Sequence, residues 1–161
     1  RIGVARALAS QPDLLVLDEP VSALDVAIQA QLLNLFKSLK DKFSLTYLFI
    51  SHDLGVIHHM CDRIAVMYLG VILETASRRS LFSQPMNPYT QALLKAVPTL
   101  KGELRSLPLS SSAVEQASAI NPAPGCRFKQ RCPEVMPVCH EKMPVLAEAA
   151  PDHWVACHLV H

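Results

Sequence analysis

The chain has few glycines, and none of them belongs to a phosphate-binding loop. The five are Gly3, Gly55, Gly70, Gly102 and Gly125. None is followed by lysine, so the chain has no Gly-x-x-x-x-Gly-Lys-Ser/Thr loop, whose backbone N–H groups wrap phosphates. These residues therefore supply no such cradle.

The sequence also lacks a long apolar run and an excess of one charge. The longest apolar run, residues 64–73, is ten residues interrupted by Gly70, about half of the roughly 20 needed to cross a bilayer. Fifteen basic residues balance fourteen acidic ones, so bulk charge predicts no special partner. Neither a basic stripe nor interleaved aromatic and basic residues appear, which argues against a nucleic-acid partner.

No helix start signal precedes the first residues. Residues 1–9, Arg-Ile-Gly-Val-Ala-Arg-Ala-Leu-Ala, already have a helical pattern, and residue 1 is arginine rather than methionine. We therefore expect the chain to be a fragment that continues upstream.

Short apolar strands alternate with amphipathic helices in the first part of the chain. Residues 14–17 and 45–50 read as buried strands, and the apolar spacing of residues 26–40 predicts a helix between them. This pattern predicts an α/β fold with a largely parallel sheet and flanking helices.

Further elements follow as far as residue 97. We expect a short helix at 54–60, strands at 64–68 and 71–75 around a Leu69-Gly70 turn, and a helix that Asn87 caps and Pro98 ends. Eight of the twelve prolines lie from Pro98 onward. The predicted domains are therefore residues 1–97, a linker at 98–124, and a Cys-rich segment at 125–161 with too little apolar matter for its own core.

Polar residues follow both predicted strands of the first part. Asp18 and Glu19 end one strand, and His52 follows the other. If the strands are neighbours, these residues meet at the carboxyl edge of the sheet, where α/β folds bind ligands. Asp18 could then hold the Mg²⁺ of a nucleotide, Glu19 could polarise a water molecule, and His52 could reach a terminal phosphate. The alternative is a solvated strand end followed by an ordinary turn.

Ser22 and Asp25 stand between the first strand and its helix. Their spacing also fits a capping box, a structural role that is compatible with any function.

In order, these segments resemble the nucleotide-binding subunits of ABC transporters. Residues 1–8 resemble the helix after the signature sequence, residues 14–20 the Walker B strand, residues 22–25 the D-loop and residues 51–53 the switch histidine. The resemblance spans residues 1–97 and implies the C-terminal part of a P-loop ABC ATPase domain. It implies that Asp18 supports Mg²⁺, that Glu19 is the catalytic base, that His52 senses the γ-phosphate of ATP, and that Asp25 acts at the interface between two subunits. Ser22 and Asp25 are expected to belong, with Asp18, to the nucleotide-binding site. The Walker A and signature sequences would lie upstream, so we expect the 161-residue chain alone to be inactive.

Four of the five cysteines cluster near the C-terminus. Cys126, Cys132, Cys139 and Cys157 are separated by five, six and seventeen residues, and Cys61 lies apart. Four thiols in a cytosolic segment without a core suggest one metal centre rather than two disulfides. The spacing alone leaves iron–sulfur and zinc open. The missing Cys-x-x-Cys knuckle counts against zinc, while His140 and His158, next to two of the cysteines, keep a mixed zinc site open.

The later segments resemble the oligopeptide, dipeptide and nickel importer ATPases. Residues 87–94 resemble their His-Pro-Tyr-Thr helix, with Asn87 in place of histidine, and residues 124–128, 131–133 and 153–159 resemble their C-terminal segment. The resemblance favours a [4Fe–4S] cluster on the four cysteines, with zinc as the alternative and free thiols as a third possibility.

This resemblance also implies a working context. It implies an ATPase that energises peptide import as a homo- or heterodimer, bound to membrane permease subunits on the cytoplasmic face and served indirectly by an extracytoplasmic binding protein. Peptide is the expected solute, and nickel stays open. The competing interpretations are a non-transport ABC ATPase acting on nucleic acid and an inactive split-gene product.

Overall fold

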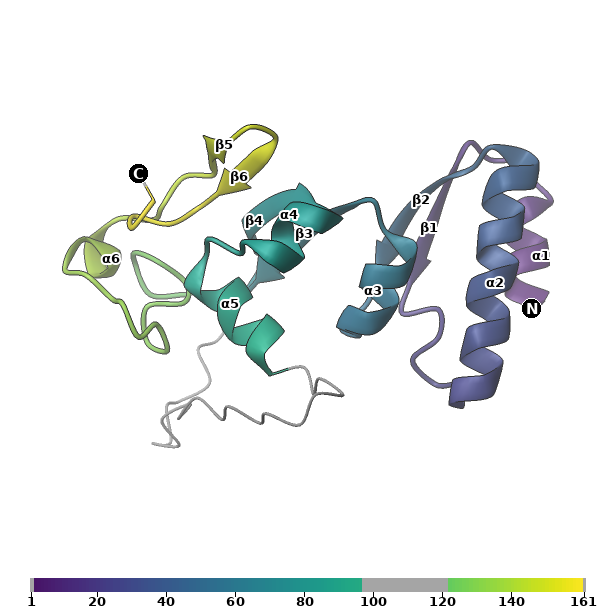
Figure 1. Ribbon diagram of the computed structural model, residues 1–161, viewed down its shortest axis with the longest axis horizontal. Coiled ribbons are helices and arrows are strands. Elements are labelled where there is room, and N and C mark those ends of the chain that lie inside the picture. The colour runs from purple at the N-terminus through teal and green to yellow at the C-terminus, as the bar shows by residue number, and fades with distance from the viewer. Residues whose placement is uncertain (1, 97–121, 161) are drawn as a thin grey trace. The chain divides into compact units, whose positions relative to one another are not determined.

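A computed structural model of the chain describes residues 2–96 and 122–160 (Figure 1). Its backbone contacts form two compact units, Arg1–Cys61 and Asp62–His161. The predicted boundary after residue 97 and most of the predicted linker 98–124 lie outside the described residues, so the three-domain division stays a prediction. None of the helices within the described ranges is long and apolar enough to cross a membrane.

The first unit contains the elements that the sequence predicts, with bounds that differ by three residues at most. Helix α2 extends past the predicted end at residue 40, because Ser44 in the left-handed region terminates it and donates its N–H to the Lys40 carbonyl. In chain order the elements are α1 (Ile2–Leu8), β1 (Leu14–Asp18), α2 (Val26–Phe43), β2 (Thr46–Ile50) and α3 (Leu54–Met60).

Strands β1 and β2 are parallel neighbours. Their register runs from Leu14 opposite Thr46 to Asp18 opposite Ile50, and α2 makes the crossover that parallel strands require. The neighbour relationship expected from the sequence is therefore confirmed. Among the described residues, this pair is the whole of the parallel sheet.

One face of the parallel pair is packed against helices. Leu15 and Leu17 of β1 are buried with Leu32, Leu33 and Phe36 of α2, and α1 packs against the same cluster (Figure 1). The Phe36 ring also makes edge contacts with two aromatic rings of β2, Tyr47 and Phe49. Apolar burial of this kind contributes roughly 1.5–3 kcal/mol per large side chain.

The second unit is built on a four-stranded sheet whose strand pairs are all antiparallel. The strand order is β3-β4-β6-β5, so parallel pairing among the described residues is confined to β1 and β2, and a largely parallel sheet stays a prediction. The predicted turn joins β3 to β4, with both Leu69 and Gly70 at positive φ, as a two-residue hairpin turn requires. The bounds are β3 (Arg63–Tyr68), β4 (Val71–Ser77), α4 (Arg78–Ser83), α5 (Pro88–Lys95), α6 (Val138–Glu141), β5 (Ala147–Ala150) and β6 (His153–Val155).

The Cys-rich segment is not an isolated appendage. Its strand β6 pairs with β4, with Glu74 opposite Val155 and Thr75 opposite Trp154. Leu73 and Val155 are fully buried. The low apolar content predicts that something other than its own core stabilises this segment. Strand pairing with β4 contributes to that stabilisation.

Candidate functional site

The polar edge of the first unit lies at the carboxyl ends of β1 and β2. Asp18 is the last residue of β1 and pairs with Ile50, the last residue of β2. Glu19 then donates its backbone N–H to the Ile50 carbonyl at 3.0 Å. The structure therefore brings Asp18, Glu19 and His52 to one edge of the sheet, as their positions in the sequence predict.

The backbone at Glu19 is in a rarely populated conformation. Its φ is +46°, in the left-handed region that residues other than glycine seldom occupy and that costs on the order of 1 kcal/mol or more. The hydrogen bond to Ile50 holds this turn in place. The conformation turns the Glu19 carboxylate toward the segment that follows β2.

Glu19 and His52 form a direct hydrogen bond. The His52 Nδ1–H donates to Glu19 Oε1 at 2.8 Å, and the His52 backbone N–H donates to the same oxygen at 3.2 Å. The bond to Glu19 and the charge of that carboxylate raise the pKa of His52 above its ordinary value. The His52 side chain is 80% exposed and that of Glu19 is 36% exposed, so both are accessible to a ligand.

Asp18, Ser22 and Asp25 surround this pair with different roles. Asp18 is exposed at the strand end. The Ser22 hydroxyl donates to the Glu19 carbonyl at 3.1 Å, and the Asp25 carboxylate accepts the Ile28 N–H at 2.9 Å as the N-cap of α2. The suggested capping box between Ser22 and Asp25 is wrong, because Ser22 supports the Glu19 turn instead.

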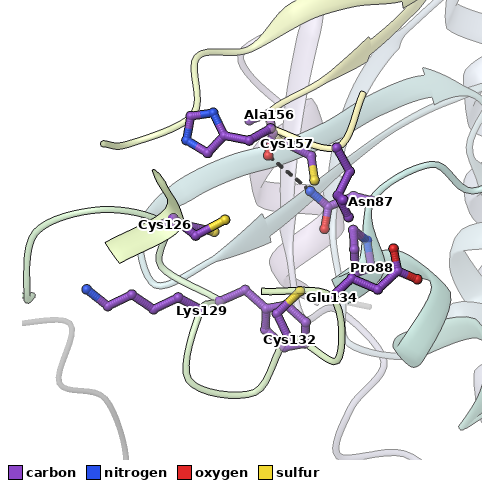
Figure 2. Close-up of a pocket in the computed structure, with 12 residues that line it drawn as sticks. Asn87, Pro88, Cys126, Lys129, Cys132, Glu134, Ala156 and Cys157 are labelled. Atoms are coloured by element: carbon purple, nitrogen blue, oxygen red, sulfur yellow. Dashed lines mark hydrogen bonds between the residues drawn. The ribbon is translucent and has the colours of Figure 1, made fainter. Parts of the chain in front are cut away.

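The four clustered cysteines line one pocket of the second unit, called the thiol pocket below (Figure 2). The sulfur atoms of the three labelled cysteines, Cys126, Cys132 and Cys157, point into it. Burial raises the pKa of each of these three thiols. Asn87, Phe128 and Ala156 also contribute to the lining.

The donor chemistry of the thiol pocket fits a metal centre. Four thiols are the ligand set of iron–sulfur clusters and of structural zinc. In the described ranges, however, no three or more His, Cys, Asp or Glu residues are grouped closely enough to hold a metal ion. The structure therefore gathers the predicted ligands around one space without placing them at coordination distance.

Gly125 allows the loop that carries Cys126 to approach α6, which carries Cys139. It has a φ of +84°, and a Cβ atom there would overlap the backbone of Cys139 and His140, lying only 2.7 Å from the His140 carbonyl carbon. The next N–H, that of Cys126, donates to the Cys139 carbonyl at 2.8 Å. Only glycine fits this approach, so Cys126 and Cys139 are held together by the backbone.

Sequence reasoning missed a buried polar network beside the thiol pocket. Glu74, Asn87 and His153 are buried, and the Glu74 carboxylate accepts hydrogen bonds from the Asn87 backbone N–H and the His153 ring. Asn87 was identified only as a helix cap. The signal that could have revealed the network was a glutamate in the middle of the apolar strand 71–77, because a buried carboxylate needs partners.

The chain is similar to proteins that are named for ATP binding in oligopeptide or peptide transport. Residues 73–139 match the family described as "Oligopeptide/dipeptide transporter, C-terminal region". The oligopeptide transport ATP-binding protein AppF of Bacillus subtilis is 51% identical over 161 residues, which are 99% of this chain and 49% of AppF. YkfD of the same organism, named for the same role, is 49% identical with 99% and 49% coverage. A Brucella ovis protein named for ATP binding in peptide import is 48% identical over 157 residues, with 98% and 49% coverage.

The chain thus spans about half the length of the curated relatives that it matches. The match covers almost all of the chain, including β1 and the thiol-bearing segment. Together with the family match over residues 73–139, it shows that the chain is similar to about half of the length of oligopeptide and peptide transport ATP-binding proteins.

Proposed function

We propose that the chain supplies half of the nucleotide site of an ATP-hydrolysing ABC subunit that energises the import of oligopeptides or dipeptides. The hydrogen bond between Glu19 and His52 at the ends of two parallel strands carries this proposal. It places a carboxylate and an imidazole together at the sheet edge where α/β folds bind ligands. In this proposal the finer fold is that of a P-loop ABC ATPase domain with its largely parallel sheet.

Each polar residue of the edge has a part in the proposed hydrolysis. Asp18 holds Mg²⁺, which neutralises phosphate charge when bound. Glu19 accepts a proton from the water that attacks the terminal phosphate, and His52 orients Glu19 and contacts that phosphate. Asp25 lies at the contact with a second ATPase subunit, and Ser22 and Asp25 belong, with Asp18, to the nucleotide-binding site. The remaining phosphate contacts come from outside these 161 residues.

The proposed assembly rests on the resemblance of the sequence to importer ATPases. Two ATPase subunits, identical or different, bind permease subunits at the cytoplasmic face of the membrane, and an extracytoplasmic binding protein delivers the peptide. Nucleic acid has no part in it. The relatives' names, which refer to peptide transport and ATP binding, support this context.

We also propose that Cys126, Cys132, Cys139 and Cys157 hold a [4Fe–4S] cluster, with zinc as the alternative. The four thiols that line one pocket support this cluster. A bound metal centre would stabilise a segment that has little hydrophobic core of its own. Anaerobic purification followed by iron, sulfide and zinc analysis should find iron and sulfide with broad visible absorption. Stoichiometric zinc without iron would contradict the cluster.

The ATPase proposal is tested in the natural full-length subunit assembled with its partners. Glu19→Gln should retain nucleotide binding and lower ATP hydrolysis by roughly 100-fold or more, as expected for loss of a general base. Glu141→Gln, at an exposed glutamate of the second unit, is the control and should hydrolyse ATP normally. Unchanged phosphate release by Glu19→Gln would refute the role of Glu19.

A further inference from the structure

We propose that Asn87 is a positioning residue for the thiol pocket, and that its side-chain amide fixes the segment that carries Cys157. This inference adds a positioning residue to the metal centre proposed above, and the purpose of that residue rests on that proposal. The contacts themselves belong to the protein alone, so they can be tested in the metal-free chain.

The Asn87 amide binds the peptide unit that precedes Cys157. Its Nδ2 group donates to the Ala156 carbonyl at 3.1 Å, drawn in Figure 2, and more weakly to the Leu73 carbonyl at 3.4 Å. The Ala156 N–H donates to the same Leu73 carbonyl at 2.8 Å. Asn87 is only 3% exposed, so water does not compete for these bonds. The amide therefore ties the start of α5 to the residue adjoining Cys157.

Asn87 is itself held on two sides. Its Oδ1 atom accepts the Tyr89 N–H at 2.9 Å as the N-cap of α5, and Pro88 occupies the first position of the helix. Its backbone N–H donates to Glu74 Oε2 at 3.1 Å. Both ends of the amide are thus used, and the side chain has one orientation.

Glu74 anchors this arrangement to the sheet. Its carboxylate is fully buried and accepts the Met86 N–H at 2.8 Å and the His153 Nε2–H at 2.7 Å, besides the Asn87 N–H. A buried carboxylate is tolerated only when it is satisfied in this way. Because His153 begins β6, the network connects β4, the turn before α5 and the strand that leads to Cys157.

The thiol pocket therefore has two separate supports. Cys126 and Cys139 are joined by their own backbone hydrogen bond beside Gly125. Cys157 reaches the pocket from the other side, beyond β6, where Asn87 holds its neighbour Ala156. Metal ligands need placement within about 0.5 Å to bind well, and hydrogen bonds around them commonly supply it. Asn87 supplies this placement for Cys157, one of the four proposed ligands.

Two substitutions separate the donor role of Asn87 from its capping role. Asn87→Ser keeps an N-cap oxygen and removes the amide donor, and Asn87→Asp does the same while adding a charge near Glu74. Asn34→Asp, at an exposed position of α2, controls for the added charge. If Asn87→Asp does not fold, Asn87→Ser still decides the question.

The test measures the labelling rate of each cysteine in the metal-free, reduced, full-length protein. Brief exposure to a maleimide, followed by peptide mass analysis, should show Cys157 labelled about fivefold faster in Asn87→Ser, the factor expected for one lost hydrogen bond. Cys126, Cys132 and Cys139 should keep their rates, and Asn34→Asp should match the parent. An equal rise at all four thiols, or no rise at Cys157, would overturn the proposal.

A second measurement separates this inference from the metal-centre proposal. If the parent protein carries a metal, Asn87→Ser should lose it to a chelator several-fold faster, and equal loss would overturn the positioning role. If the parent carries no metal, the metal centre is refuted, while the labelling result still decides whether Asn87 fixes Cys157.

Discussion

His52 Nδ1 donates a hydrogen bond to Glu19 Oε1 at 2.8 Å, across the ends of β1 and β2. The bond favours the charged imidazole, so the pKa of His52 is raised above its ordinary value of about 6.5. NMR titration of the His52 ring should therefore give a midpoint above that value, and Glu19→Gln should lower it toward 6.5.

The hydrogen bond between Glu19 and His52 also makes the stability of the fold depend on pH. Because the folded-state pKa of His52 is the higher one, the stabilisation is fully present below the unfolded-state pKa and is lost as pH rises through the folded-state value. Unfolding of Glu19→Gln and of the parent should therefore converge at alkaline pH. A His52 pKa that does not respond to Glu19→Gln would contradict the bond.

The core of the first unit predicts a contrast between two phenylalanines of α2. Phe36 is fully buried, whereas Phe43 is 54% exposed, with the Lys42 ammonium over its ring. Phe36→Ala should lower the free energy of unfolding by about 3–5 kcal/mol because it leaves a cavity. Phe43→Ala should cost less than ~1 kcal/mol. Urea titration followed by circular dichroism compares them, and equal losses would place the core elsewhere.

Two glycines at positive φ should respond differently to alanine. Gly125→Ala adds a Cβ atom into the backbone of Cys139 and His140, whereas Gly70→Ala meets nothing within 4 Å. Both substitutions place alanine in the left-handed region, which destabilises the fold by about 1 kcal/mol. Only Gly125→Ala must also move Cys126 away from Cys139. Maleimide labelling of these two thiols should rise in Gly125→Ala alone. Equal labelling in both variants would show that the close approach is dispensable.

Asp25 offers a way to separate a cap from an interface contact. Asp25→Ala should cost α2 about 1 kcal/mol, because the Ile28 N–H loses its acceptor, while Asp25→Asn should preserve the cap. Thermal unfolding measures the first effect. If Asp25 also acts at a subunit contact, Asp25→Asn should lower ATP hydrolysis in the assembled transporter at unchanged thermal stability. Normal hydrolysis by Asp25→Asn would confine the residue to capping.

Burial of the thiols predicts a pH dependence of metal loading. The pKa values of Cys126, Cys132 and Cys157 are raised by burial, and a metal must displace their protons. Zinc affinity of the metal-free chain should therefore rise with pH from 6 to 9, as competition with a chromophoric chelator would show. The maleimide reaction of these thiols should lag behind that of a short peptide thiol at pH 8. A flat profile would contradict protonated, buried thiols.

The strongly periodic elements were predictable from the sequence. The spacing of Leu32 and Phe36 defined α2, and the apolar runs defined β1 and β2 well enough to place His52 near Glu19. Of the second sheet, the β3–β4 hairpin was predictable and the other two strands were not, because β5 and β6 have only four and three residues and show no measurable period. Glu74 was missed because its partners, Asn87 and His153, lie 13 and 79 residues away.

The pairing of β6 with β4 means that the C-terminal strands shield a vulnerable backbone. Without β5 and β6, the N–H and C=O groups of β4 around Glu74 and Thr75 would lose their partners, and a bare strand edge is a template for joining another chain. A protease cut or a stop codon between α5 and β6 would therefore do more than remove the cysteines. It would convert the second unit into a surface prone to self-association.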